Sequence, residues 1–289
     1  MKKENLARLM LIASMSIFGT IALFVRNIPL PSGEIALYRA ILAALLISVF
    51  LIVTKQKIDF GKIKRDIPLL LFSGVAMGIN WILLFEAYKY TTVSAATLSY
   101  YFAPVIVTAV CPILFREKMT AKQIICFVMS TVGLVLITGI GGIGERGLIG
   151  ILLGLGAAVF YASVVLINKF IKRVEGIHRT LLQFIAAIVT LIPYTALTNG
   201  VNLTSLNPKG WICLLIIGLI HTGVAYCLYF SSLKEMTGQK AAILSYIDPL
   251  VAVLISVTVL GEKMTLMQAI GGLLILGFTL YNELPARKK

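Results

Sequence analysis

Ten blocks of about twenty apolar residues divide this chain, and no other feature of the sequence limits its fold as strongly. An α-helix needs about 20 residues to cross the ~30 Å hydrocarbon core of a bilayer. Lipid offers the backbone no hydrogen-bond partner, so each block must form a helix. We therefore predict an all-α integral membrane protein with transmembrane helices roughly at 6–25, 34–54, 67–87, 93–115, 120–139, 147–168, 178–197, 210–231, 238–260 and 265–282.

The charge content agrees with this prediction. Charged residues make up 13% of the chain and hydrophobic residues 59%, whereas a soluble domain carries ~25% charged residues. The net charge of +14 does not indicate a nucleic-acid partner, because the basic residues lie between the apolar blocks and form no basic domain. No stretch between the spans is long enough for a soluble domain, so function must reside in the membrane region or its short loops.

The cysteines and the first apolar block raise two further questions. We expect no zinc site and no disulfide framework, because the cysteines lie inside apolar blocks without CxxC spacing. The cysteines are Cys111, Cys126, Cys213 and Cys227.

The block at 6–25 follows Lys2-Lys3, as in a signal peptide, but it is long and no small-x-small cleavage site follows it. We expect a retained first helix.

The distribution of Lys and Arg predicts the orientation in the membrane. With the N-terminus inside, 20 of these residues fall on the cytoplasmic side and 5 on the outer side, and Arg39 remains inside a span. This asymmetry follows the positive-inside rule. It predicts a multi-pass protein of the cell membrane with an even number of spans and both termini in the cytoplasm.

The sequence repeats at an offset of 145 residues. Between residues 85 and 125, twelve of 41 ungapped positions are identical to the residue 145 positions later. The two units, 1–143 and 144–289, each contain five spans, so they must lie in opposite orientations. Inverted repeats are typical of secondary transporters, in which a central site is exposed alternately to each side. The recurring residues include Phe85, Lys89, Thr92, Ala96, Tyr101 and Pro104, which reappear as Phe230, Lys234, Thr237, Ala241, Tyr246 and Pro249.

One repeated tetrapeptide marks a tight turn in each half. Glu117-Lys118-Met119-Thr120 recurs as Glu262-Lys263-Met264-Thr265, and a Gln follows each Thr by three residues. Thr-x-x-Gln fits a capping box, which predicts a new helix after each turn. We expect Glu117 and Glu262 to serve the hairpin turns, with a direct role in transport as the alternative.

These features resemble the ten-helix drug/metabolite transporter superfamily, in its EamA-like branch. The resemblance covers nearly the whole chain, with one departure: Phe18 stands where such proteins often have Trp. It implies a basket of helices around a central cavity that carries small-molecule metabolites without nucleotide hydrolysis. It names no substrate, since members carry amino acids, nucleotide-related compounds, amines, sugars and drugs. Its marks are Phe18-Gly19, Tyr38-Arg39-Ala40, residues 85–104 and 230–249, and the two Glu-Lys-Met-Thr turns.

Asp248 is the strongest candidate for a transport residue. It lies ten residues into the span 238–260, about 15 Å deep and near the midplane. An acidic side chain there costs on the order of 2.5–3.5 kcal/mol on insertion scales. The repeat places Ala103 at the equivalent position, so a structural role common to both halves does not explain the carboxyl group. We expect Asp248 to bind an amine or a coupling proton; the alternative is a protonated, hydrogen-bonded side chain inside the bundle.

Two prolines in repeat-related spans predict kinks. Pro104 and Pro249 each remove a backbone donor, and the freed carbonyls are tolerated where they are buried in protein or line a watery cavity. Tyr101 and Tyr246 lie one turn earlier, with Ser245 beside Asp248. This polar and aromatic stripe is expected to face protein or a cavity rather than lipid.

His221 and Arg39 are polar residues within other spans. His221 is expected at the depth of Asp248 and could relay a proton with it, or be a neutral His bonded to a neighbouring helix. Arg39 lies about 8 Å inside the second span. It could pair with Glu34 or Glu86, bind a carboxylate or phosphate, or snorkel to the surface.

Further polar and aromatic residues complete the candidate translocation site. Gln183 occupies a place in the second half comparable to that of Arg39, which favours an inward position for both. The other residues could contact substrate or serve packing and interface anchoring. They are Asn80, Trp81, Tyr161, Tyr226 and Tyr229.

We predict a secondary transporter, in the exporting direction, of small organic metabolites such as amino acids. No nucleotide-binding GxxxxGK[ST], HExxH or GxSxG motif is present, so we expect no ATP-driven pump, no enzyme, no metal and no cofactor. A membrane enzyme acting on lipid-linked substrates and a channel or sensor are the alternatives. The sequence leaves proton coupling and a homodimer open.

Overall fold

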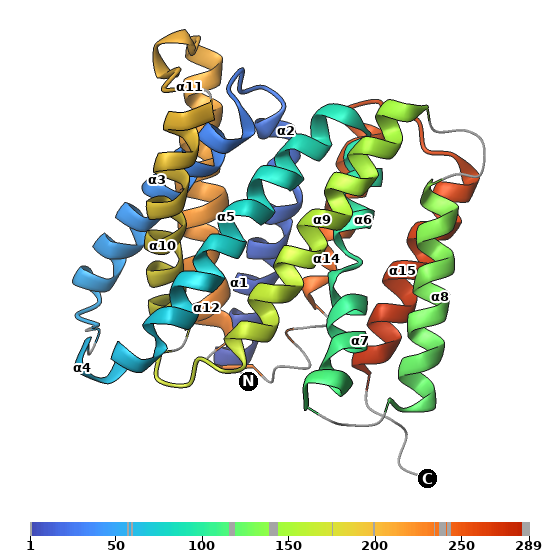
Figure 1. Cartoon of the computed structure of the whole chain (residues 1–289), viewed down its shortest axis with the longest axis horizontal. Coiled ribbons are helices and arrows are strands. Elements are labelled where there is room, and N and C mark those ends of the chain that lie inside the picture. The colour runs from blue at the N-terminus through green and yellow to red at the C-terminus, as the bar shows by residue number, and fades with distance from the viewer. Residues whose placement is uncertain are drawn as a thin grey trace.

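The computed structural model describes residues 2–56, 58, 60–115, 119–138, 144–174, 176–198, 200–233, 235–236, 241 and 244–284. These residues form helices and short connections and contain no β-strand (Figure 1). The first half comprises α1 (Lys2–Gly19), α2 (Ile21–Val25), α3 (Ser32–Val53), α4 (Phe60–Ile63), η1 (Lys64–Asp66), α5 (Ile67–Tyr90), α6 (Val93–Tyr100), α7 (Ala103–Phe115) and α8 (Ala121–Thr138).

The second half repeats this order. It comprises α9 (Glu145–Asn168), α10 (Gly176–Thr198), η2 (Leu203–Ser205), α11 (Pro208–Leu215), the π-helix η3 (Ile216–Val224), α12 (Ala225–Leu233), α14 (Ile247–Thr258) and α15 (Leu266–Glu283). Part of the ninth predicted span, residues 237–240 and 242–243, lies outside the described residues, as do Glu117 and Lys118.

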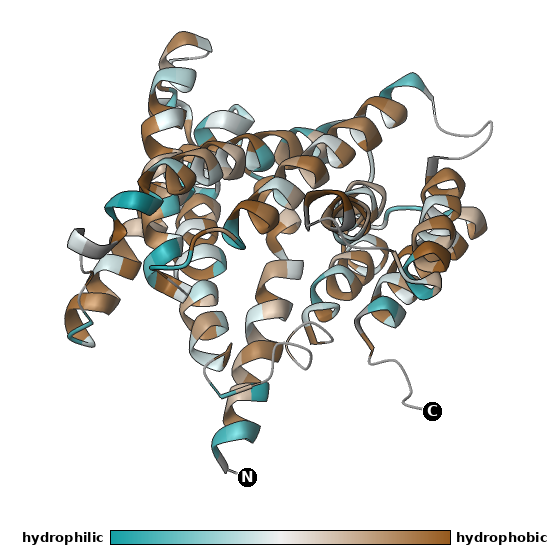
Figure 2. Cartoon of the chain, turned by 60° about the horizontal axis from the view of Figure 1, so that its bottom comes forward, coloured by the Kyte–Doolittle hydropathy of each residue, from teal (hydrophilic) through white to brown (hydrophobic). Residues whose placement is uncertain are grey.

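The predicted spans correspond to helices. Seven helical segments of the described chain are long and apolar enough to cross a membrane, and three shorter apolar helices occupy the remaining predicted spans. Hydrophobic residues predominate along the bodies of the helices, and hydrophilic residues gather mainly at their ends (Figure 2). The bundle thus has two ends: the near end, where α1 begins and α15 ends, and the far end, where α2 ends and α11 begins (Figure 1).

The two halves interlock. The bounds of α15 are those of α8 shifted by 145 residues, and these two helices pack against each other, as do the repeat-related α3 and α10. The first span of each half packs on the third span of the other: α9 on α5, and α1 on α12. Neither half therefore forms an independent bundle, and the space between the halves is bounded by both.

The predicted capping boxes are confirmed. The Thr120 hydroxyl accepts the backbone N–H of Gln123 at 3.2 Å, and the Gln123 side chain accepts the backbone N–H of Thr120 at 2.8 Å. Thr265 and Gln268 repeat both bonds at the start of α15. Each pair satisfies two backbone donors that a helix start otherwise leaves unbonded.

The predicted kinks are breaks in the helices. The fourth span stops being helical at Tyr101 and resumes at Ala103, one residue before Pro104. In the second half a turn at Tyr246 precedes α14, which contains Pro249. Proline lacks the N–H that would bond the preceding turn, which explains why both breaks fall at the repeat-related tyrosine.

Glycines bring some helices into backbone contact. A Cβ added to Gly271 of α15 would lie 2.4 Å from the carbonyl oxygen of Gly133 in α8. A Cβ on Gly19, at the end of α1, would lie 2.5 Å from the carbonyl oxygen of Asp248. Three of the four cysteines, Cys126, Cys213 and Cys227, are free and buried, as expected of small apolar side chains.

Candidate translocation site

Asp248 lies in the first turn of α14, just after the helix break, and faces the first half of the chain. The Tyr101 hydroxyl donates a hydrogen bond of 2.6 Å to its Oδ2. The carboxyl group is only partly buried, although its backbone is in close contact with Gly19 on α1. The two repeat-related breaks thus meet, with a carboxyl group on one and a phenol on the other.

Arg39 is buried in α3, with 4% of its surface exposed. Its Nε donates to Thr222 Oγ1 at 3.0 Å, and its guanidinium carbon lies 4.6 Å from the ring centre of Trp81 and 5.2 Å from that of Phe85. Both distances are within the range of a cation–π contact. Neither Nη atom has a hydrogen-bond partner among the described residues, and neither is sealed from solvent.

The ion pair expected between Arg39 and Glu34 or Glu86 is absent from the described structure. Glu34 is fully buried and accepts two hydrogen bonds from Asn202 and one from Tyr38. Glu86 bonds Ser32 and Lys89. Both carboxylates are bonded at the far end, so Arg39 has no anionic partner among the residues that the structure describes. Its burial also excludes snorkelling to the surface in this state.

A π-helix presents the residues next to Arg39. In η3 the Thr222 hydroxyl donates to the Ile217 carbonyl at 2.7 Å, and His221 Nδ1 lies 3.3 Å from the Ile216 carbonyl. Both side chains therefore bond the carbonyl five residues earlier, which supports the wider turn. π-Helical segments occur frequently at functional sites, and here the segment lets one hydroxyl hold the Arg39 guanidinium.

The structure places no direct bond between the described side chains of His221 and Asp248. His221 Nε2 lies 2.7 Å from Thr20 Oγ1, and its ring packs on Phe24 at 4.9 Å between centres. Both ring nitrogens are thus engaged elsewhere. His221 and Asp248 both contact the end of α1, where His221 touches Thr20 and the Asp248 carbonyl approaches Gly19.

Several other predicted site residues hold helices together. The amide of Asn80 donates to the Ala157 carbonyl at 2.7 Å and so joins α5 to α9. Gln183 bonds Ser73 and Asn168 and is separate from Arg39. The Ser245 hydroxyl donates to the Ala241 carbonyl of its own segment, and Tyr246 precedes α14 with a partly buried side chain.

A cavity of about 690 Å³ opens at the near end, among the ends of α3, α9, α10 and α12. Phe230 lines it and stacks on Tyr226, which in turn contacts Phe184. Phe184 packs edge-on against Trp81, the ring that lies under Arg39. A continuous set of aromatic contacts therefore leads from this cavity to the buried guanidinium.

The repeat shows which of these groups are specific to one half. Shifting by 145 residues places Phe184 at the position of Arg39 and Ala103 at that of Asp248. His221 and Thr222 correspond to Ala76 and Met77. Thr222 and Thr20 were not predicted, because a single Thr in an apolar span is common and only the packing shows its partner.

No group of three or more His, Cys, Asp or Glu side chains in the described part of the chain could hold a metal ion. The chemistry that these residues offer is hydrogen bonding and charge: a guanidinium with open donors and a carboxyl group bound to a phenol.

Comparison with known proteins agrees with this architecture. The model of the EamA-like transporter family matches residues 5–139 and again residues 148–282. An uncharacterized transporter, YxxF, of Bacillus subtilis (strain 168) is 30% identical over 277 residues, which cover 95% of this chain and 88% of that protein. An uncharacterized transporter of Archaeoglobus fulgidus is 26% identical over 267 residues, with 92% of each chain covered.

One solved crystal structure shares the fold. It covers 94% of this chain and 95% of its own, with a TM-score of 0.65 and 17% sequence identity.

Proposed function

This chain belongs to the EamA-like transporter family, and from this premise we propose that it is a secondary transporter that exports small organic metabolites such as amino acids. The cargo carries an anionic group and an amine. Transport proceeds by alternating access to a site between the two halves, with the near end and both termini in the cytoplasm. The positive-inside asymmetry of 20 to 5 basic residues supports this orientation.

The observation that carries the proposal is the unpaired guanidinium of Arg39. A buried cation is normally paired, because desolvation costs several kcal/mol per ion. Here the described structure supplies one hydroxyl, two aromatic faces and no carboxylate. The planar fork of Arg suits a carboxylate or phosphate, so an anionic group of the substrate is the partner that the site lacks.

Asp248 supplies the opposite charge. When ionised, its carboxylate accepts the Tyr101 hydroxyl and keeps further lone pairs for an amine. It lies in the partly exposed interior, where a substrate ammonium or a proton can reach it. A carboxyl group on the second half and a guanidinium on the first half together select a molecule that bears both charges.

The test is ligand-induced stabilisation of the purified protein in detergent, across a library of amino acids, amines and carboxylates. A ligand at 100 times its Kd adds about 2.7 kcal/mol of stability. We expect a ligand whose effect is lost in Asp248→Asn, which keeps the size of the side chain, and retained in Glu86→Gln, which neutralises a carboxylate at the far end. Stabilisation that survives in Asp248→Asn and in Arg39→Met would place the site elsewhere.

A further inference from the structure

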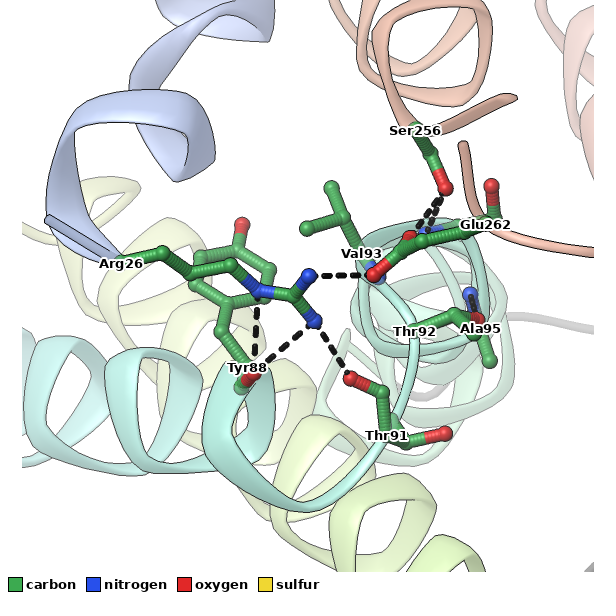
Figure 3. Close-up of polar contacts among 9 residues, drawn as sticks. Arg26, Tyr88, Thr91, Thr92, Val93, Ala95, Ser256 and Glu262 are labelled. Carbon is green, nitrogen blue, oxygen red and sulfur yellow. Dashed lines mark hydrogen bonds and ion pairs between the residues drawn. The ribbon is translucent and has the colours of Figure 1, made fainter. Parts of the chain in front are cut away.

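Three segments that are distant in the sequence meet at the far end of the bundle (Figure 3). Arg26, which follows α2, donates to the carbonyl of Tyr88 at 3.0 and 3.2 Å and to that of Thr91 at 2.9 Å. Its Nη1 forms an ion pair with Glu262, in the turn between α14 and α15. One guanidinium thereby ties the end of the first span to the loop between α5 and α6 and to the second half.

The second oxygen of Glu262 accepts a hydrogen bond from the backbone at the start of α6. It accepts the backbone N–H of Val93 at 2.8 Å and the hydroxyl of Ser256. The backbone N–H of Ser94 donates to the same Ser256 hydroxyl at 3.3 Å. A carboxylate at a helix N-terminus is stabilised by the free N–H groups and by the helix dipole, so this contact is stronger than an ion pair alone.

The burial of this network separates it from an ordinary surface ion pair. The side chains of Arg26 and Glu262 are 28% and 11% exposed, whereas those of the neighbouring pair Lys89 and Glu86 are 43% and 33% exposed. Exposed pairs contribute little, but charge-assisted bonds that share a largely buried carboxylate are roughly twice as strong as neutral ones.

The network joins the parts that must separate for the far end to open. It connects α2, α5 and α6 of the first half to α14 and α15 of the second. Transporters built from inverted repeats open by moving one repeat-derived bundle against the other. The near end, by contrast, contains the cavity of about 690 Å³. At the far end, this network ties helices of the two halves together.

We propose that Arg26 and Glu262 form the outer gate of the transporter: they hold the far end shut while the site is open to the near end, and their contacts must break before cargo leaves. This inference rests on alternating access and on the orientation given above. It gives a role to the repeated tetrapeptide, whose Glu was expected to serve mainly the turn.

The gate is linked to the site by one pair of helices. α6 begins at the Glu262 contact and ends beside Tyr101, and α14 begins beside Asp248 and ends near Ser256. These two helices pack against each other. They are joined by Glu262 and Ser256 at the far end and by the bond between Tyr101 and Asp248 in the interior.

The experiment measures entry of a membrane-impermeant thiol reagent from outside the cell. The reporter is Ser94→Cys, in a protein whose native cysteines are replaced. Ser94 lies just below the gate, is 4% exposed, and its hydroxyl has no hydrogen-bond partner among the described residues, so the substitution is close to isosteric and removes no side-chain bond. The reporter is combined in turn with Glu262→Gln, Arg26→Gln and the control Lys89→Gln, which removes a charge from the same face.

Labelling should be slow with the intact gate and with Lys89→Gln. It should be about tenfold faster or more with either gate variant, since a charge-assisted hydrogen bond favours the closed state by at least that factor. Size-exclusion profiles identify variants that do not fold. If Glu262→Gln does not fold, the labelling rate of Arg26→Gln tests the gate proposal instead. Unchanged labelling in a folded gate variant overturns the proposal. The labelling assay requires no substrate. If the gate variants label faster but no ligand stabilises the protein, the gate proposal stands and only the proposed cargo is refuted.

Discussion

Two charged residues inside the membrane region form the core of the proposed substrate site. Asp248 is bonded to a phenol, and Arg39 is bonded to a hydroxyl and stacked on aromatic rings. A structural charge would be neutralised by a neighbour, as Asp66 is by Arg173 at the near end. Arg39 has no such neighbour in the described chain, which fits the proposed role in binding an anionic group of the cargo.

Replacement of Arg39 by Met tests this directly. Desolvation of a buried ion costs several kcal/mol, whereas a cation–π contact returns about 0.5–1 kcal/mol at exposed sites and about 2 kcal/mol or more when desolvated. We therefore expect Arg39→Met to unfold at the same or a higher temperature than the wild type while transport is lost. Thermal unfolding in detergent and uptake into vesicles measure the two effects. A variant that is less stable by about 2 kcal/mol and still transports would show that the charge is structural.

At the scale of helices, proline breaks and glycine contacts position the site. The breaks at Tyr101 and Tyr246 bring a phenol and a carboxyl group together, and Gly19 admits the Asp248 backbone against α1. Away from the site, Gly133 and Gly271 bring α8 and α15 into backbone contact. Small residues at helix interfaces in membranes permit this approach, because packing replaces the hydrophobic effect as the driving force.

Substitution of glycine in α15 should have opposite effects at two positions. Gly271→Ala places a Cβ 2.4 Å from a carbonyl oxygen, so α8 and α15 must separate, at a cost of about 1–3 kcal/mol. Gly277→Ala meets no atom within 4 Å and should gain roughly 0.5–1 kcal/mol from higher helix propensity. Unfolding temperatures of the two variants give the comparison, and a stable Gly271→Ala would contradict the close approach.

The link between site and gate predicts coupling between two distant bonds. Tyr101→Phe removes only the hydroxyl that bonds Asp248, so it should also accelerate labelling of Ser94→Cys. If both bonds break in the same separation of α6 from α14, the double variant with Glu262→Gln should deviate from additivity by about 0.5–3 kcal/mol in the apparent closing free energy. Additive effects would mean that the gate and the site act independently.

The whole molecule is a pair of interlocked halves with an asymmetric interior. Both halves share their helix order, their breaks and their capping boxes, yet the guanidinium belongs to one and the carboxyl group to the other. In the proposed mechanism, the symmetry of the scaffold allows two related conformations, and the asymmetry of the side chains selects the cargo. Fold similarity to other transporters therefore does not specify the substrate.

Orientation is a property of the whole molecule and can be measured with single cysteines. Ser231 lines the near-end cavity, so Ser231→Cys should react with an impermeant reagent in inside-out vesicles and not in intact cells. Lys209→Cys, exposed at the start of α11 on the far end, should show the reverse. The opposite pattern in both variants would reverse the proposed orientation.

The chain alone was sufficient for everything that depends on local pattern. Apolar length predicted the spans, Thr-x-x-Gln predicted the two capping boxes, the prolines predicted the breaks, and the 145-residue offset predicted two related halves. That the halves interlock followed only from the packing of their helices. The sequence did not predict the partners of the polar side chains. Arg39 and Thr222 are 183 residues apart and Arg26 and Glu262 are 236 apart, and the expected partners Glu34 and Glu86 were nearer in sequence but engaged by loops. Hydrophobicity and caps act within one helix, whereas a side chain finds its partner only after helices from both halves have packed.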